Sequence, residues 1–146
     1  MKILETCATI HASPEKIWAA LIDFSAYPSW NPFIRSIAGI PRLGEKISAR
    51  IEPPGGQAMT FHPQIIRFAE GKELRWLGHL LLPGIFDGEH CFALHDEGNG
   101  TTLFSQTEIF RGLLVPFFEK TITVNTKQGF EAMNLALKIR CEEKPS

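Results

Sequence analysis

The hydrophobic and polar positions divide the chain into a long strand-forming part and a helical tail. Residues 3–11 alternate loosely and are rich in Ile and Thr, which is typical of a β-strand. The following ASPEKIWAAL predicts a helix, because Ser13 is a good N-cap and Pro14 suits the first helical position. Pro28 and Pro32 then limit any further helix to a short turn.

Five clusters rich in Gly, Pro, Asp and Asn interrupt the chain between residues 39 and 101. They are GIPRLGE, EPPGGQ, AEGKE, LPGIFDG and DEGNG. The runs between and after them have the length and composition of strands; examples are ELRWLGHL, EHCFALH and TTLFSQTEIF. This alternation of short strands and turns predicts an antiparallel meander.

Apolar side chains in the tail recur every three or four residues from Leu113 onward, as on a helix with one buried face. The buried stripe would comprise Phe118, Ile122, Thr126, Phe130, Met133 and Leu137. The polar side would carry Lys120, Lys127, Glu131, Asn134 and Lys138. The run TITVNT has a strand-like composition, but the stripe passes through it in phase. The pattern therefore predicts one helix from about residue 113 to 141, with a kink or slow start near Pro116.

The composition is that of an ordinary globular protein. Hydrophobic residues make up 44% of the 146 residues, which fits one domain over residues 1–146. A net charge of −1 gives no general attraction to nucleic acid, and the apolar stretch LGHLLLPGIF is too short for a membrane span. Three cysteines without a C-x-x-C pair indicate no disulfide framework, and Glu5 interrupts what would be the apolar part of a signal peptide. A reducing cytoplasm is the expected compartment, and no cofactor is indicated.

Several local motifs carry a resemblance to a known family. They are ASPEKIWAAL, YPSWNPF, LRW before a turn, EHCFAL followed by GNGTT, and TEIFRGLL leading into the tail. In this order the chain resembles the START-like (SRPBCC) superfamily, in its polyketide cyclase/dehydrase-like branch. The resemblance implies an α+β helix-grip fold, with a curved antiparallel sheet of about seven strands around a long C-terminal helix and two short helices after the first strand. It also implies an apolar cavity between sheet and helix.

The stretch FDGEHCFALH, residues 86–95, gathers side chains that bind metals and move protons. On a strand, neighbouring side chains point to opposite faces. Glu89, Cys91 and His95 would share the outer face, and His90 would lie inside among hydrophobic residues. A metal ion needs three or four converging ligands, whereas one strand face supplies two at most. No metal site is therefore predicted here.

The GNG turn predicts an antiparallel hairpin between this strand and the next. A register that pairs Phe92 with Phe104 sets His90 beside Gln106. The inner face of the second strand would then carry Thr102, Phe104, Gln106, Glu108 and Phe110. A slip by one residue would turn the alternate side chains inward instead.

The inward polar residues have both structural and functional interpretations. A lone buried histidine such as His90 is more often a hydrogen-bonded core residue than a catalyst. A buried carboxylate such as Glu108 requires a partner, for which Arg35, Arg67 and Arg75 are candidates, unless it lies near the sheet rim in water. A role as acid or base would need a substrate proton in reach. Catalytic residues are therefore left unassigned.

One flank of the predicted helix carries only small or polar side chains, which favours unfilled volume beside it. This flank comprises Thr121, Asn125, Gly129, Ala132 and Ala136. A leucine in place of Gly129 would then fill empty space. The candidate ligand-binding residues are Trp30, Trp76, His90, Phe92, Gln106, Glu108, Phe110, Phe118, Ile122, Gly129 and Met133.

Three functions are compatible with the sequence. The first is binding of a small hydrophobic or amphipathic molecule, lipid-like or polyketide-like, whose polar end would be oriented by His90, Gln106 and Glu108. The second is a cyclase or dehydratase-type enzyme that uses the same cavity. The third is a protein-interaction module. The sequence ranks them in that order, and it leaves open both the ligand and the oligomeric state.

Overall fold

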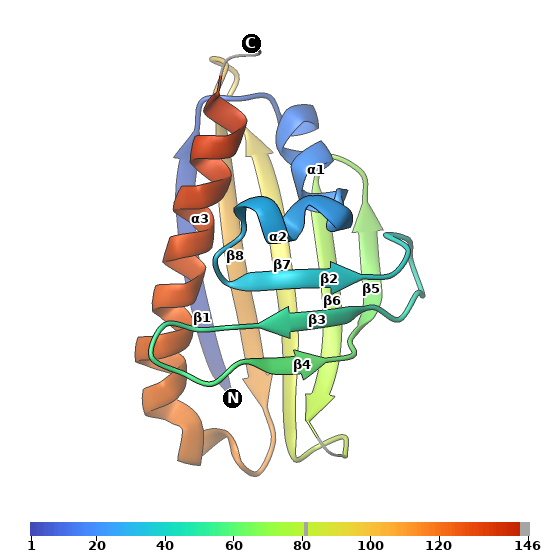
Figure 1. Cartoon of the computed structure of the whole chain (residues 1–146), viewed down its shortest axis with the longest axis vertical. Helices are drawn as coiled ribbons and strands as arrows, with labels where there is room; N and C mark the ends of the chain where they lie inside the picture. Colours follow the sequence, from blue (N-terminus) through green and yellow to red (C-terminus); the bar gives the residue numbers. More distant parts are fainter. Residues whose placement is uncertain (81, 144–146) are drawn as a thin grey trace.

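A computed structural model describes residues 1–80 and 82–143. Within these residues, eight strands form two antiparallel sheets, a five-stranded sheet in the order β1-β8-β7-β6-β5 and a three-stranded sheet in the order β2-β3-β4 (Figure 1). The large sheet consists of β1 (Lys2–Ile10), β5 (Gln64–Ala69), β6 (Glu73–Leu80), β7 (Phe86–Asp96) and β8 (Thr102–Arg111). The small sheet consists of β2 (Ile34–Ala38), β3 (Ser48–Ile51) and β4 (Met59–Phe61). The α+β helix-grip arrangement is confirmed.

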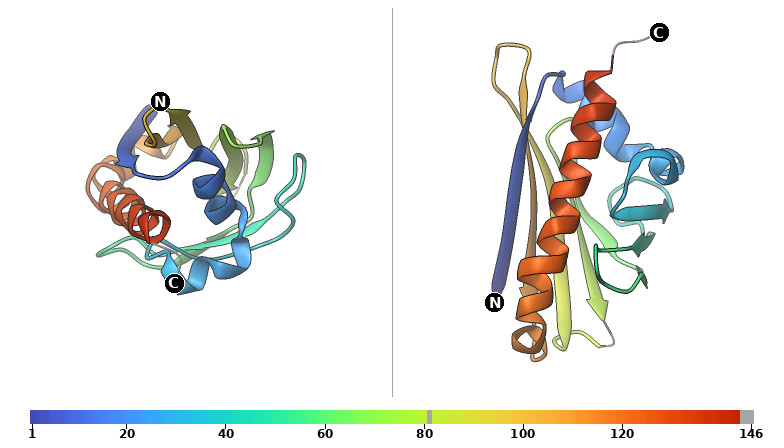
Figure 2. Two further views of the ribbon diagram at one scale, coloured as in Figure 1. Left: turned by 90° about the horizontal axis from the view of Figure 1, so that it is seen from above. Right: turned by 60° about the vertical axis from the view of Figure 1, so that its left-hand side comes forward.

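Two short helices follow β1, as predicted. Helix α1 (Pro14–Ile22) begins where Ser13 accepts a hydrogen bond from the backbone N–H of Lys16 at 3.2 Å, as an N-cap does. A 3₁₀ turn, η1 (Phe24–Ala26), leads directly into α2 (Tyr27–Trp30). In the two views of Figure 2, the large sheet, the C-terminal helix and the small sheet stand around a common interior.

The C-terminal helical segment has three parts of different geometry. It begins with a 3₁₀ turn, η2 (Val115–Phe118), continues as a π-helix, η3 (Thr121–Thr126), and ends as the α-helix α3 (Lys127–Glu142). TITVNT is helical rather than a strand, but the expectation of a single helix from 113 to 141 was wrong in detail. Pro116 favours a tight first turn, and the β-branched residues of TITVNT form α-helix poorly. A π-helix is rare and is frequently found at functional sites.

The register of the β7–β8 hairpin differs from the prediction by two residues. Phe92 lies opposite Gln106, and His90 lies opposite Glu108. The faces nevertheless agree with the prediction, because side chains alternate with a period of two and a shift of two keeps each residue on its face. Thus His90 is buried inside and His95 is exposed on the outer face.

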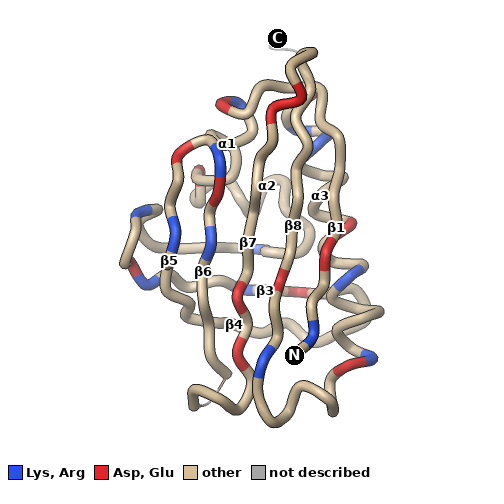
Figure 3. Tube along the Cα trace, turned by 180° about the vertical axis from the view of Figure 1, so that it is seen from behind, with Lys and Arg blue, Asp and Glu red and all other residues tan. Residues whose placement is uncertain are grey.

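Figure 3 shows acidic and basic positions on the neighbouring strands β5, β6 and β7, whose side chains form a network of ion pairs on the outer face of the large sheet. Arg75 contacts Glu89 at 2.7 Å and Glu73 at 3.1 Å, and Arg67 also pairs with Glu73. Burial by itself would raise the pKa of Glu73, but its bonds to Arg75 outweigh burial and hold that pKa below its ordinary value. Beneath this network, burial raises the pKa of the Cys91 thiol to about 11. Cys91 is therefore a neutral thiol at pH 7 and no nucleophile.

The lowered pKa of Glu73 predicts a pH-dependent contribution to stability. Its carboxylate stabilises the fold above the ordinary glutamate pKa of about 4.3, and this contribution is lost as pH falls through the lower pKa of the folded state. Because Glu73 is partly exposed, Glu73→Gln is expected to lower the free energy of unfolding at pH 7 by about 1 kcal/mol or less. Urea unfolding at pH 7 and near pH 3 measures this difference, which should become smaller in acid. The exposed Glu70, changed to Gln, is the control, and a difference as large near pH 3 as at pH 7 contradicts the prediction.

Candidate ligand-binding site

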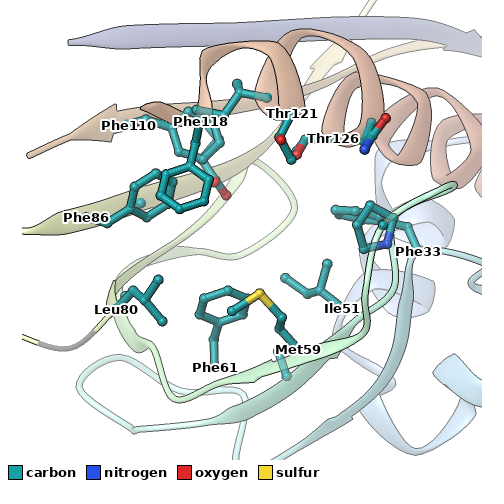
Figure 4. Close-up of a pocket in the computed structure, with 18 of the residues that line it drawn as sticks. Phe33, Ile51, Met59, Phe61, Leu80, Phe86, Phe110, Phe118, Thr121 and Thr126 are labelled. Atoms are coloured by element: carbon teal, nitrogen blue, oxygen red, sulfur yellow. The ribbon is translucent and has the colours of Figure 1, made fainter. Parts of the chain in front are cut away.

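A cavity of about 530 Å³ lies between the large sheet, the small sheet and the first turns of the C-terminal helical segment. In Figure 4, Phe86, Phe110 and Phe118 lie across the cavity from Met59 and Phe61. Most of its wall is apolar and comes from β3, β4, β6, β7 and β8 and from η3. A volume of this size is in the range of small-molecule sites, which are mostly apolar with a few polar groups.

Two glycines on neighbouring strands open room in the sheet for this cavity. Gly78 on β6 and Gly88 on β7 lie opposite each other in the ladder, and both line the cavity. The space above Gly88 is taken by the Glu108 carboxyl group, because a Cβ at Gly88 would lie 3.1 Å from Glu108 Oε2. A Cβ at Gly78 would meet only Pro63, at 3.4 Å, which is an ordinary contact.

The polar groups of the cavity come from three places. Glu108 belongs to the sheet, Thr121, Asn125 and Thr126 belong to the π-helix η3, and Gln57 belongs to the loop before β4. Of the lining residues that the structure describes, only Glu108 is ionisable. Its side chain remains 16% exposed, so the carboxyl group is reachable from the cavity.

Glu108 is the cavity end of a buried polar network of five residues: Glu108, His90, Gln106, Asn134 and Thr6. His90 Nδ1 is 2.7 Å from Glu108 Oε1, and His90 Nε2 is 2.9 Å from Gln106 Oε1. Gln106 Nε2 donates to Asn134 Oδ1 at 2.8 Å, and Asn134 Nδ2 donates to Thr6 Oγ1 at 2.9 Å. The network thus runs from the cavity to β1 and satisfies side chains whose burial would otherwise cost stability.

The two ends of the network determine the direction of its hydrogen bonds. The Thr6 hydroxyl donates its one proton to the Gln106 backbone carbonyl, so Thr6 Oγ1 must accept from the Asn134 amide nitrogen. The oxygen of Asn134 then faces the Gln106 nitrogen, which also contacts the Phe130 carbonyl oxygen. The oxygen of Gln106 therefore faces His90, and His90 Nε2 must carry a proton.

The remaining hydrogen bond, between His90 Nδ1 and Glu108 Oε1, holds one shared proton. Either His90 is charged and Glu108 ionised, or both are neutral with the proton on Oε1. The second carboxyl oxygen of Glu108, Oε2, has no proton in either arrangement. The pair therefore presents a hydrogen-bond acceptor to the cavity.

The sequence model of a family described as "Polyketide cyclase / dehydrase and lipid transport" matches residues 1–142. The chain belongs to this family. Solved structures share its fold. A START superfamily protein from Mycobacterium smegmatis is 24% identical with a TM-score of 0.73, over 96% of this chain and 97% of that one. The Zhui aromatase/cyclase from Streptomyces sp. R1128 is 12% identical with a TM-score of 0.78, over 97% and 93% of the two chains.

A hypothetical protein from Helicobacter pylori, jhp0584, is 14% identical with a TM-score of 0.80, over 97% of this chain and 88% of that one. No curated protein matches the sequence. At these identities the solved structures show the fold alone. In the described residues, every helix falls short of the length and hydrophobicity that a bilayer span requires. Nor does this part of the chain bring together three side chains that are typical metal ligands.

The structure divides the predicted site residues of this family member into two groups. Five of them line the cavity: Trp76, Glu108, Phe110, Phe118 and Ile122. The other six lie behind its wall or away from it. His90 and Gln106 belong to the buried polar network, and Met133 is fully buried in the core. Phe92 stacks on Phe104 at 5.8 Å, and Trp30 packs on Tyr27 at 5.2 Å.

Gly129, the sixth of these residues, does not face a void. A Cβ at this position would overlap the ring of Phe33, which packs edge-on against Phe130 at a centroid distance of 5.5 Å. The expectation that a leucine at Gly129 would fill empty space was therefore wrong. The free volume lies one to two turns earlier, beside Thr121, Asn125 and Thr126 of the π-helix.

Two further expectations about polar residues need correction. Glu108 pairs with His90 and not with an arginine; Arg75 is on the opposite face of the sheet, bound to Glu73 and Glu89. Asn134 was assigned to the solvent side of the helix, but it is 4% exposed and belongs to the buried polar network. The helical period alone does not show whether Asn134 is buried or exposed, because this residue lies at the border of the apolar stripe.

The small sheet supplies a wall of the cavity that was not predicted from the sequence. Met59 and Phe61 face the cavity from β4, while Thr60 between them is exposed. The alternation in MTF is the signal that would have indicated a two-faced strand. The paired glycines Gly78 and Gly88 are a second signal, since glycine inside a strand often marks a close approach.

Proposed function

We propose that this domain, expected from the sequence to span residues 1–146, binds a small hydrophobic or amphipathic molecule in the cavity. The apolar body of the ligand would lie among the aromatic side chains, and its polar end would reach Glu108. The observation that carries the proposal is an apolar cavity of about 530 Å³ with one ionisable group in its described wall. Burial of apolar ligand surface supplies about 25 cal/mol per Å² toward affinity.

Filling the cavity from the sheet side tests this proposal. Gly78→Leu places an apolar side chain in the cavity, where a Cβ makes only ordinary contacts. The variant should keep or gain stability, because glycine weakens a strand interior. N-phenyl-1-naphthylamine, whose fluorescence rises in apolar sites, should bind the wild type and raise its melting temperature with the logarithm of its excess. Gly78→Leu should lose both responses.

The matched control for this experiment is Thr60→Leu, which adds the same side chain to the exposed face of β4. It should bind the probe as the wild type does. Equal probe binding by Gly78→Leu and the wild type would show that the probe binds elsewhere. A wild type that binds no apolar probe would contradict the proposed function.

A cyclase or dehydratase-type activity is a second candidate, favoured by the unprotonated Oε2 of Glu108 at the cavity wall. Such an oxygen can accept a proton from carbon next to a carbonyl group, with the electron pair of the broken C–H bond forming an enolate. The name of the structurally similar Zhui aromatase/cyclase is compatible with this activity. Deuterium incorporation from heavy water into the methyl group of 2-acetylnaphthalene measures it by NMR. Faster exchange with the wild type than with Glu108→Gln supports an enzyme. Equal exchange rates support ligand binding without catalysis.

A further inference from the structure

We propose that the cavity selects a neutral ligand whose polar end donates a hydrogen bond, such as an alcohol or a phenol, and that it rejects carboxylates and phosphates. This inference rests on the proposed function and names the class of its ligand. The selecting group is Glu108 Oε2, which lies over Gly88 at the cavity wall.

The buried polar network makes Oε2 an acceptor. His90 Nε2 is committed to Gln106, so the one shared proton of the pair lies in the bond between His90 Nδ1 and Glu108 Oε1. In both positions of that proton the pair is neutral overall, and Oε2 keeps its lone pairs. A ligand hydroxyl or N–H finds its complement there, whereas an ether or ester oxygen finds none.

The charges around the cavity disfavour an anionic ligand. Its described lining contains no lysine, arginine or histidine, and Glu108 is its one ionisable residue. An anion in an apolar cavity without a countercharge loses much of its hydration free energy. An anion placed at Oε2 would also bring lone pairs against lone pairs.

Arg75 on β6 does not change this. Arg75 is on the outer face, where Glu73 and Glu89 neutralise it. Across the cavity, Thr121, Asn125 and Thr126 supply only neutral polar groups. A carboxylate held by these three residues at the helix side is the competing arrangement, and the experiment below distinguishes the two.

Three ligands with one naphthalene body test the inference at pH 7: 2-naphthylmethanol, its methyl ether and 2-naphthoate. Each competes with N-phenyl-1-naphthylamine, and inhibition constants are corrected for the affinity of the probe. With the wild type, the alcohol should bind about tenfold tighter than the ether, as one good hydrogen bond predicts. The carboxylate should bind more weakly than the alcohol by at least about the same factor.

Two variants at the same position separate the acceptor from the charge. Glu108→Gln should retain the preference for the alcohol, because its amide nitrogen donates to Nδ1 of neutral His90 and leaves the amide oxygen facing the cavity. Glu108→Met has a similar shape but no acceptor, so the alcohol and the ether should bind equally. If Glu108→Met does not fold, the wild type and Glu108→Gln still decide the outcome.

The outcomes distinguish this inference from the proposed function. Naphthoate binding as tightly as the alcohol, or equal binding of alcohol and ether by the wild type, overturns the inference while ligand binding stands. Loss of the preference in Glu108→Gln overturns the role of Oε2 as a neutral acceptor. If the wild type binds none of the three compounds and no probe, the proposed function itself falls.

Discussion

Gln106→Leu is expected to lower the free energy of unfolding by about 3–5 kcal/mol, the largest effect of any single change in the buried polar network. Gln106 is fully buried and connects the two halves of the network. Its removal leaves His90 Nε2 and Asn134 Oδ1 without partners in a place that water does not reach. Each unsatisfied buried group costs about 1–3 kcal/mol, and the branched side chain adds strain.

Urea unfolding followed by tryptophan fluorescence measures this loss. Gln128→Leu is the matched control, because Gln128 is exposed on α3 and the same substitution there should change stability by about 0.5 kcal/mol or less. A loss below about 1 kcal/mol for Gln106→Leu would mean that water replaces the amide, and that the proton arrangement at Glu108 is not fixed by its neighbours.

Gly129→Ala is expected to cost about 1–2 kcal/mol net, because the overlap outweighs the advantage of about 1 kcal/mol that alanine has as a helix former. The added methyl group would overlap the Phe33 ring, which is 2% exposed and held between helix and small sheet. The ring also borders the cavity, so it can move away from the added methyl group, but only by giving up its edge-on packing against Phe130. A lower free energy of unfolding for Gly129→Ala thus indicates that the position is packed, and a higher one indicates that it is empty.

A double-mutant cycle identifies the cause of this loss. Phe33→Leu makes room for the methyl group, so Gly129→Ala should be much less harmful, or even stabilising, in that background. Thermal and urea unfolding of the four proteins gives the coupling energy. A stabilised Gly129→Ala in the wild-type background would contradict the packing against Phe33 and restore the void predicted beside this residue.

Local chemistry made much of the fold predictable. The N-cap at Ser13, the turn clusters between strands and the alternation in EHCFALH depend on neighbours in the sequence, and the structure bears out each of them. The assignment of His90 to the inner face survived a register error of two residues, because a face depends only on the parity of a position. Helix formation through TITVNT was predictable from the apolar stripe, but its π geometry was not.

The sequence by itself determined the order of the elements, the family resemblance and which side of β7 and β8 faces inward. Only the tertiary structure decided where the cavity lies, because a cavity is the volume that side chains from distant segments leave unfilled. Phe33 occupies the space beside Gly129, while Gly78 leaves room in the cavity wall and Gly88 makes room for the Glu108 carboxyl group. The pairing of Glu108 with His90 was decided in the same way: the hairpin register placed the two side chains opposite each other, and a hydrogen bond acts only over such short distances.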